Sequence, residues 1–113
     1  MVLVNMRFLV IVFFVFSLSV SKDINIARSC ELNDFVSCYN LAVKLSNDKT
    51  SDSKNIDNLY IKACNGGVSH ACYNLASLYT DKDEQTAKSY YLKACQLGNQ
   101  SGCINYRSMV KNN

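Results

Sequence analysis

The chain has 113 residues, 49% of them hydrophobic, and its 12 basic and 9 acidic residues give a net charge of +3. This small charge implies no basic face for nucleic acid, so we expect no nucleic-acid partner. Proline and tryptophan are absent. The absence of proline removes the commonest helix breaker and favours an all-helical protein.

The first 21 residues have the pattern of a secretory signal peptide. Arg7 is followed by an apolar run from Phe8 to Phe16 and then by serines at positions 17, 19 and 21. The apolar stretch 8–20 has 13 residues, fewer than the ~17 to 25 that a membrane-spanning helix needs. We therefore expect a cleaved leader over residues 1–21, no permanent membrane anchor, and a protein that is secreted or periplasmic.

The exact ends of the leader stay open. Cleavage after Ser21 would leave Lys22 as the mature start, and cleavage after Ser19 is the alternative. Translation from Met6 instead of Met1 would give a shorter leader that begins directly before Arg7.

Six cysteines form three pairs, each with seven residues between its members. The pairs are Cys30/Cys38, Cys64/Cys72 and Cys95/Cys103. On one straight helix such a pair would lie ~12 Å apart, beyond the ~7 Å Cα limit of a disulfide, so the chain must reverse inside any bonded pair. Turn-forming residues stand in all three intervals: Asn33-Asp34, Asn65-Gly66-Gly67 and Gly98-Asn99.

An even cysteine count in a small exported chain predicts disulfides, and pairing of adjacent cysteines is the simplest of the 15 connectivities. A metal site is the alternative. Zinc sites use closely spaced cysteines or cysteine and histidine sets, and His70 is the only histidine. We predict no metal and no cofactor, and an exposed, unspecialised His70.

The flanks of the pairs repeat as well, with periods of 34 and 31 residues between the first cysteines. Such self-similarity predicts a solenoid of small supersecondary units. We predict an all-α solenoid of three αα-hairpin repeats, at about 22–46, 54–80 and 83–111. The expected helices are 23–31, 34–46, 54–66, 69–80, 83–97 and 100–111, with a helix start at a capping box formed by Asp81 and Glu84.

Three further features of the repeats carry expectations. Ala42 and Ala76 are small enough to let neighbouring helices approach, whereas Arg107 at the equivalent place suits a last repeat that faces water. The polar run 46–58 is predicted to be the linker between the first and second repeats. It is either a solvated loop or a binding loop. The seven tyrosines fall mostly at core spacing and are expected to pack rather than to form a binding patch.

The motifs around the cysteines resemble those of a known family. Lys-Ala-Cys stands at 62–64 and 93–95, and Cys-Tyr-Asn-Leu-Ala at 38–42 and 72–76. With the cysteine spacing, these resemble disulfide-bridged Sel-one-like repeats of the tetratricopeptide-like superfamily, in particular the Helicobacter cysteine-rich proteins. The resemblance covers residues 22–113 and implies one disulfide in each hairpin. It weakens before Cys30 and at Tyr106-Arg107.

Two functions follow as hypotheses. The first is a monomeric module that binds a peptide or protein, from the host or the envelope, with Asn40, Asn74 and Asn105 as candidate ligand contacts; each asparagine could equally satisfy backbone groups at its own turn. The second, a weak β-lactam hydrolase or penicillin-binding protein, is implied by the resemblance alone. Its nucleophile motif Ser-x-x-Lys occurs in the mature part at Ser46, Ser51 and Ser108, where chance alone predicts about one match. All three lie in the linker or at the C-terminus and not at a rigid buried turn, so the catalytic residues stay unassigned.

Overall fold

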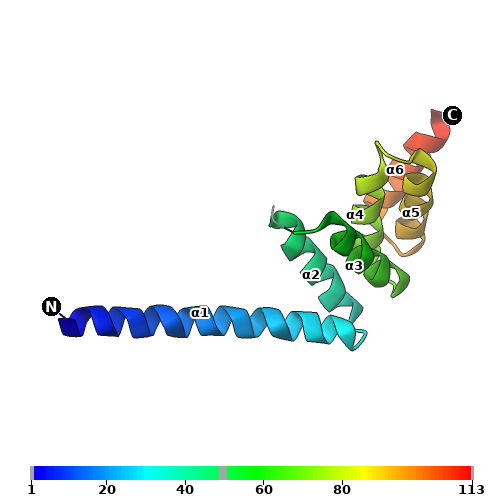
Figure 1. Cartoon of the computed structure of the whole chain (residues 1–113). Helices are drawn as coiled ribbons and strands as arrows, with labels where there is room; N and C mark the ends of the chain where they lie inside the picture. Colours follow the sequence, from blue (N-terminus) through cyan, green and yellow to red (C-terminus); the bar gives the residue numbers. More distant parts are fainter. Residues whose placement is uncertain (1, 49–50, 113) are drawn as a thin grey trace.

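A computed structural model describes residues 2–48 and 51–112, and these form six helices joined by short turns (Figure 1). No strand occurs in the described ranges. The helices are α1 (Val2–Glu31), α2 (Phe35–Asn47), α3 (Ser53–Asn65), α4 (Ser69–Tyr79), α5 (Glu84–Gln96) and α6 (Gln100–Lys111). Each helix packs against the next one along the chain, which confirms the predicted αα-hairpin solenoid with a disulfide in every hairpin.

The bounds of α2 to α6 agree with the predicted helices to within one residue. The predicted capping box was wrong, because Asp83 and not Asp81 caps α5: its carboxylate accepts from the backbone N–H of Thr86 at 3.2 Å. The linker predicted over 46–58 is shorter than expected, since α3 already begins at Ser53 with Asp52 as its N-cap. Positions 49 and 50 of that linker lie outside the described residues, so its role as a binding loop stays untested.

The first helix is much longer than predicted. We expected a helix over 23–31, and α1 instead runs without a break from Val2 to Glu31 and projects from the repeats (Figure 1). No proline or glycine occurs between these residues, so nothing in the local sequence interrupts the helix. At 1.5 Å per residue its 30 residues span about 45 Å.

The described apolar side chains between Phe8 and Val20 on α1 are largely exposed. Phe8 is 69% exposed and Phe13 73%. Within the described residues, one stretch, Arg7–Glu31, is long and apolar enough to cross a membrane, a test that signal sequences also pass. The leader over 1–21 stays a prediction. Among the residues whose burial the structure describes, every buried one lies at or after Cys30.

The core of the repeats is made of small side chains. Leu75 is the largest fully buried one, and most of the others are alanines and cysteines, with Ala42 and Ala76 fully buried as predicted. Tyr60 and Tyr91 are only 4% exposed, and the remaining tyrosines are half-buried against the core, which confirms their role in packing. Arg107 is exposed, as expected for a last repeat. A core this thin needs covalent support.

Candidate functional site

The three hairpin turns share one backbone geometry. Asn33, Gly67 and Gly98 each lie three residues after the first cysteine of a pair, and their φ values are 67°, 92° and 94°. This left-handed conformation is one that glycine and asparagine adopt at low cost. The turn residues singled out from the sequence therefore include the residue that reverses the chain in every repeat.

Hydrogen bonds close each turn as a Schellman motif. The backbone N–H groups of Asp34, Val68 and Asn99 donate to carbonyls five residues earlier, at 3.0, 3.0 and 2.9 Å. The same three residues are the N-caps of α2, α4 and α6, so one helix ends and the next begins within a few residues.

This tight reversal brings each cysteine pair together. The Cα–Cα distances within the bonded pairs are 4.6 Å for Cys30–Cys38, 4.7 Å for Cys64–Cys72 and 4.5 Å for Cys95–Cys103. No free cysteine remains in the described chain. The first two bridges are buried and the third is half-buried. No thiol is therefore left for a cysteine nucleophile.

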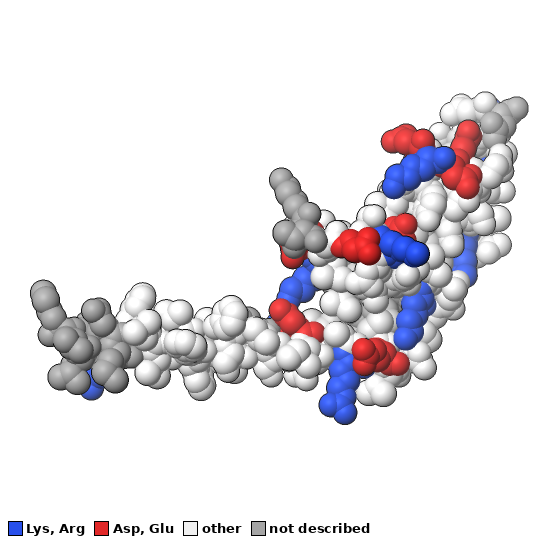
Figure 2. Space-filling model, viewed as in Figure 1, with Lys and Arg blue, Asp and Glu red and all other residues white. Residues whose placement is uncertain are grey.

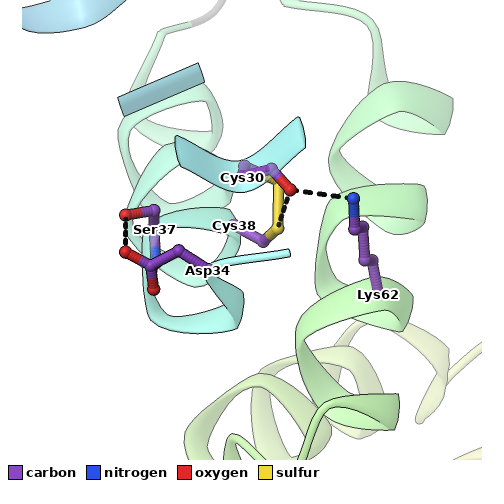
Figure 3. Close-up of a disulfide and its surroundings, with 5 residues drawn as sticks. All are labelled: Cys30, Asp34, Ser37, Cys38 and Lys62. Atoms are coloured by element: carbon purple, nitrogen blue, oxygen red, sulfur yellow. Dashed lines mark hydrogen bonds between the residues drawn. A yellow bond between two sulfur atoms is a disulfide. The ribbon is translucent and has the colours of Figure 1, made fainter. Parts of the chain in front are cut away.

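Neighbouring repeats are joined through the lysine of the Lys-Ala-Cys motif. The Nζ atom of Lys62 donates to the carbonyl of Cys30 at 2.8 Å (Figure 3), and that of Lys93 donates to Oδ1 of Asn65 at 2.8 Å. Both acceptors stand at the C-terminal end of the preceding hairpin's first helix, where a cation offsets the helix dipole. The sequence showed that this lysine recurs, but not what it binds.

Tyrosines pack across the same two boundaries. The ring centroids of Tyr39 and Tyr60 are 6.2 Å apart, and those of Tyr73 and Tyr91 are 5.5 Å apart in an edge-on arrangement. The hydroxyls of Ser77 and Thr80 lie 3.2 and 3.3 Å from that of Tyr91.

The three candidate asparagines occupy equivalent places on α2, α4 and α6 but differ in surroundings. Asn40 is exposed, and Asn74 donates from Nδ2 to the Tyr60 hydroxyl at 3.4 Å. Asn105 is half-buried and lines a shallow cleft between α4, α5 and α6. Tyr91 is the tyrosine equivalent to Tyr60, and its hydroxyl lies beside those of Ser77 and Thr80. Within the described residues, no hydrogen bond joins Asn105 to Tyr91 in the way that one joins Asn74 to Tyr60.

The cleft has a volume of about 230 Å³ and joins polar groups to an apolar floor. Its lining residues are Thr80, Tyr91, Asn105, Ser108 and Met109. Sequence reasoning identified Asn105 and missed the rest, because the cleft forms only where the second and third repeats meet. Hydroxyl and amide groups beside a methionine suit the backbone and side chains of a peptide.

Local electrostatics perturb few groups. Hydrogen bonds from Ser37 lower the pKa of Asp34 (Figure 3), and hydrogen bonds from Thr86 lower that of Asp83, both being exposed N-caps. The charge of Asp57 raises the pKa of the Tyr79 hydroxyl, which donates to that carboxylate at 3.4 Å. On the face in Figure 2, basic and acidic side chains are interspersed over the repeats.

The residues proposed for hydrolysis are not assembled into a site. The Ser46 hydroxyl donates to the carbonyl of Val43 at 2.8 Å, and its motif partner at position 49 lies outside the described residues. Ser51 stands in the connection between α2 and α3. Ser108 and Lys111 do share a surface cleft with Arg107, but both are exposed at the end of α6.

Metal binding finds no support in the described ranges, where no three histidine, cysteine or acidic side chains cluster. His70 is exposed, and its ring centroid lies 6.2 Å from that of Tyr39.

The chain is thus a disulfide-stapled repeat protein built of three αα-hairpins, and a small cleft lies between its last two repeats. Comparison with protein-family models, with curated proteins and with solved structures finds no match to it.

Proposed function

We propose that this chain is an exported interaction module that binds a peptide or an extended segment of a protein. The single observation that carries the proposal is the disulfide in every hairpin, around a core of alanine and cysteine. Such bridges persist in oxidising compartments, and the apolar N-terminal segment supplies the means of export. The relation to Sel-one-like repeats, in particular to the Helicobacter cysteine-rich proteins, belongs to this proposal and rests on the cysteine spacing and the repeated motifs.

The ligand contact that we propose is the cleft around Asn105. An amide side chain can donate to and accept from a peptide backbone at the same time, and the Ser108 hydroxyl adds a second polar group beside the apolar Met109. The ligand would be an envelope or host protein segment rather than a buried small molecule, because the cleft is shallow. Asn40 and Asn74 have surroundings that make them weaker candidates.

Panning a displayed peptide library against the oxidised domain would test this proposal. We expect enriched peptides whose affinity falls about tenfold in Asn105→Ala, because a lost hydrogen bond in a binding site costs about 1 to 1.5 kcal/mol. Asn40→Ala is the matched control, since that exposed asparagine lies outside the cleft. Equal losses in both variants, or peptides that bind the reduced and alkylated chain equally well, would refute the site.

A further inference from the structure

The two boundaries between repeats are built from the same positions, and these positions recur at both ends of the array. The corresponding sets, counted from the cysteines, are Ile26, Tyr60 and Tyr91; Arg28, Lys62 and Lys93; Val36, His70 and Ser101; and Tyr39, Tyr73 and Ile104. Each internal boundary combines residues of one repeat with residues of the next, and each of these two sets is half of the boundary. The first repeat therefore carries the half that the second partner contributes to such a boundary, and the third repeat carries the half that the first partner contributes.

The first half is exposed at the start of the array, on what we call the N-terminal face: Ile26, Arg28, Leu32 and Val36. Leu32 is 75% exposed and Val36 57%, whereas Ile26 is half-buried although its counterparts Tyr60 and Tyr91 are buried.

In the second repeat the equivalent residues contact the preceding repeat. His70 lies against Tyr39, Lys62 donates to the Cys30 carbonyl, and a Cβ atom added to Gly66, the counterpart of Leu32, would meet the Phe35 ring at 2.0 Å. The N-terminal face therefore carries the positions by which a repeat docks on the preceding one, and no other repeat covers them in the described part of the chain.

The second half is exposed at the other end, on what we call the C-terminal face: Ile104, Gln96 and the carbonyl of Cys95. Ile104 is 63% exposed, whereas Tyr39 and Tyr73 at the same position are half-buried against the next repeat. Cys95 and Gln96 correspond to Cys30 and Asn65, whose oxygen atoms accept from Lys62 and Lys93.

We propose that two copies of this chain associate head to tail, with the C-terminal face of one copy packed on the N-terminal face of the next. The register of the internal boundaries then places Ile104 against Ile26 and Val36 of the second copy. It also places the Arg28 guanidinium beside the Cys95 carbonyl or the Gln96 amide oxygen. A second copy is the occupant because its own end carries the complementary half of this boundary.

Arg107 makes this association weaker than the internal boundaries. It occupies the position of Ala42 and Ala76, which are fully buried in the two repeats that another repeat follows. Docking a second copy would remove water from the Arg107 guanidinium, which opposes association. The contact is heterologous, so it leaves one free face at each end of a dimer. This inference departs from the monomer expected from the sequence, because the two half-boundaries become visible only once the internal contacts are known.

Sedimentation of the oxidised chain from residue 22 to 113 tests the proposal. This chain keeps all three disulfides and every residue that the structure describes as buried. We expect the sedimentation coefficient to rise with concentration. Val36→Asp places a charge on the N-terminal face and Ile104→Asp places one on the C-terminal face, both at exposed positions. Each variant should weaken self-association by about tenfold or more. An equimolar mixture of the two variants should form a dimer and nothing larger, since each variant supplies the face that the other lacks.

Two further variants sharpen the test. Ile24→Asp should behave as the unmodified chain, because its counterparts Asn58 and Ser89 remain exposed where a preceding repeat is present. Arg107→Ala should strengthen association on the order of tenfold, since the charge is no longer buried. A chain that stays monomeric from micromolar to millimolar concentration would overturn the proposal. So would dimers of Ile104→Asp alone, or a mixture that stays monomeric.

Discussion

Removing the central disulfide should expose how far the fold depends on its staples. In the double variant Cys64→Ala, Cys72→Ala, the chain loses a bridge between residues eight apart in sequence, both fully buried. Closing a loop of this size is worth about 2.5 kcal/mol in the chain-entropy model. The two missing sulfur atoms leave small voids that add about 1 to 2 kcal/mol, because the alanine-rich surroundings have few side chains that could fill them.

A total loss of about 3.5 to 4.5 kcal/mol should lower the melting temperature of this small domain by roughly 15 to 35 °C. Thermal and urea unfolding followed by far-ultraviolet circular dichroism measures it. The matched control is Cys95→Ala, Cys103→Ala, in which the sequence separation is the same but the cysteines are half-buried, so the loss should be smaller. An unchanged unfolding midpoint for the central variant, or a larger loss for the control, would refute the reasoning.

Three other changes test separate parts of the structure. Gly98→Ala should destabilise the fold by about 1 to 2 kcal/mol through the positive φ of this position alone, since no atom lies within 4 Å of the added Cβ. Gly98→Asn should cost less, because Asn33 adopts the same conformation at the equivalent position of the first repeat. Chemical denaturation ranks the stabilities of the two variants, and the reverse order would contradict the turn argument. Asp34 and Asp83 have lowered pKa values in the folded chain, so their contribution to stability is present above the ordinary value of 3.8 and is lost as the pH falls through the folded pKa. Asp83→Asn keeps an N-cap side chain and should reduce the loss of folding free energy as the pH falls below about 4. Urea titrations at several acidic pH values would measure this loss. An unchanged loss would show that Asp83 does not cause it. Oxidised protein should hydrolyse a chromogenic cephalosporin no faster than its reduced, unfolded form, and Ser108→Ala should change nothing; turnover abolished by that substitution would make the protein a hydrolase instead.

The sequence predicted most of the fold because its signals are local. Turn residues between paired cysteines locate the reversals, and the repeats set the helix register, so the bounds of α2 to α6 follow to within one residue. Two local predictions were wrong for local reasons as well. The start of α5 has two aspartates close together, Asp81 and Asp83, and the sequence alone did not rank them. The N-terminal end of α1 was placed at the expected cleavage point, although no residue there ends a helix.

The candidate site was predicted only in part. The recurrence of Asn40, Asn74 and Asn105 was visible in the sequence, and nothing in that pattern distinguishes the three. The difference arises from neighbours: Asn74 meets the Tyr60 hydroxyl, whereas the corresponding Tyr91 hydroxyl is engaged from the preceding repeat. Thr80 and Met109, which complete the cleft, had no signal in the sequence at all.

The sequence by itself determined the repeat unit: a helix, a turn closed by a left-handed residue, a second helix, and two cysteines placed to bridge them. These features depend on residues within about ten positions of one another, where backbone conformation and spacing decide the outcome. Only the tertiary structure decided what happens between units. It set the acceptor of Lys62, the availability of Asn105, and the exposure of Val36 and Ile104 at the two ends of the array. Those outcomes depend on which side chains from other repeats reach the same space, and packing across a boundary fixes that where local spacing does not.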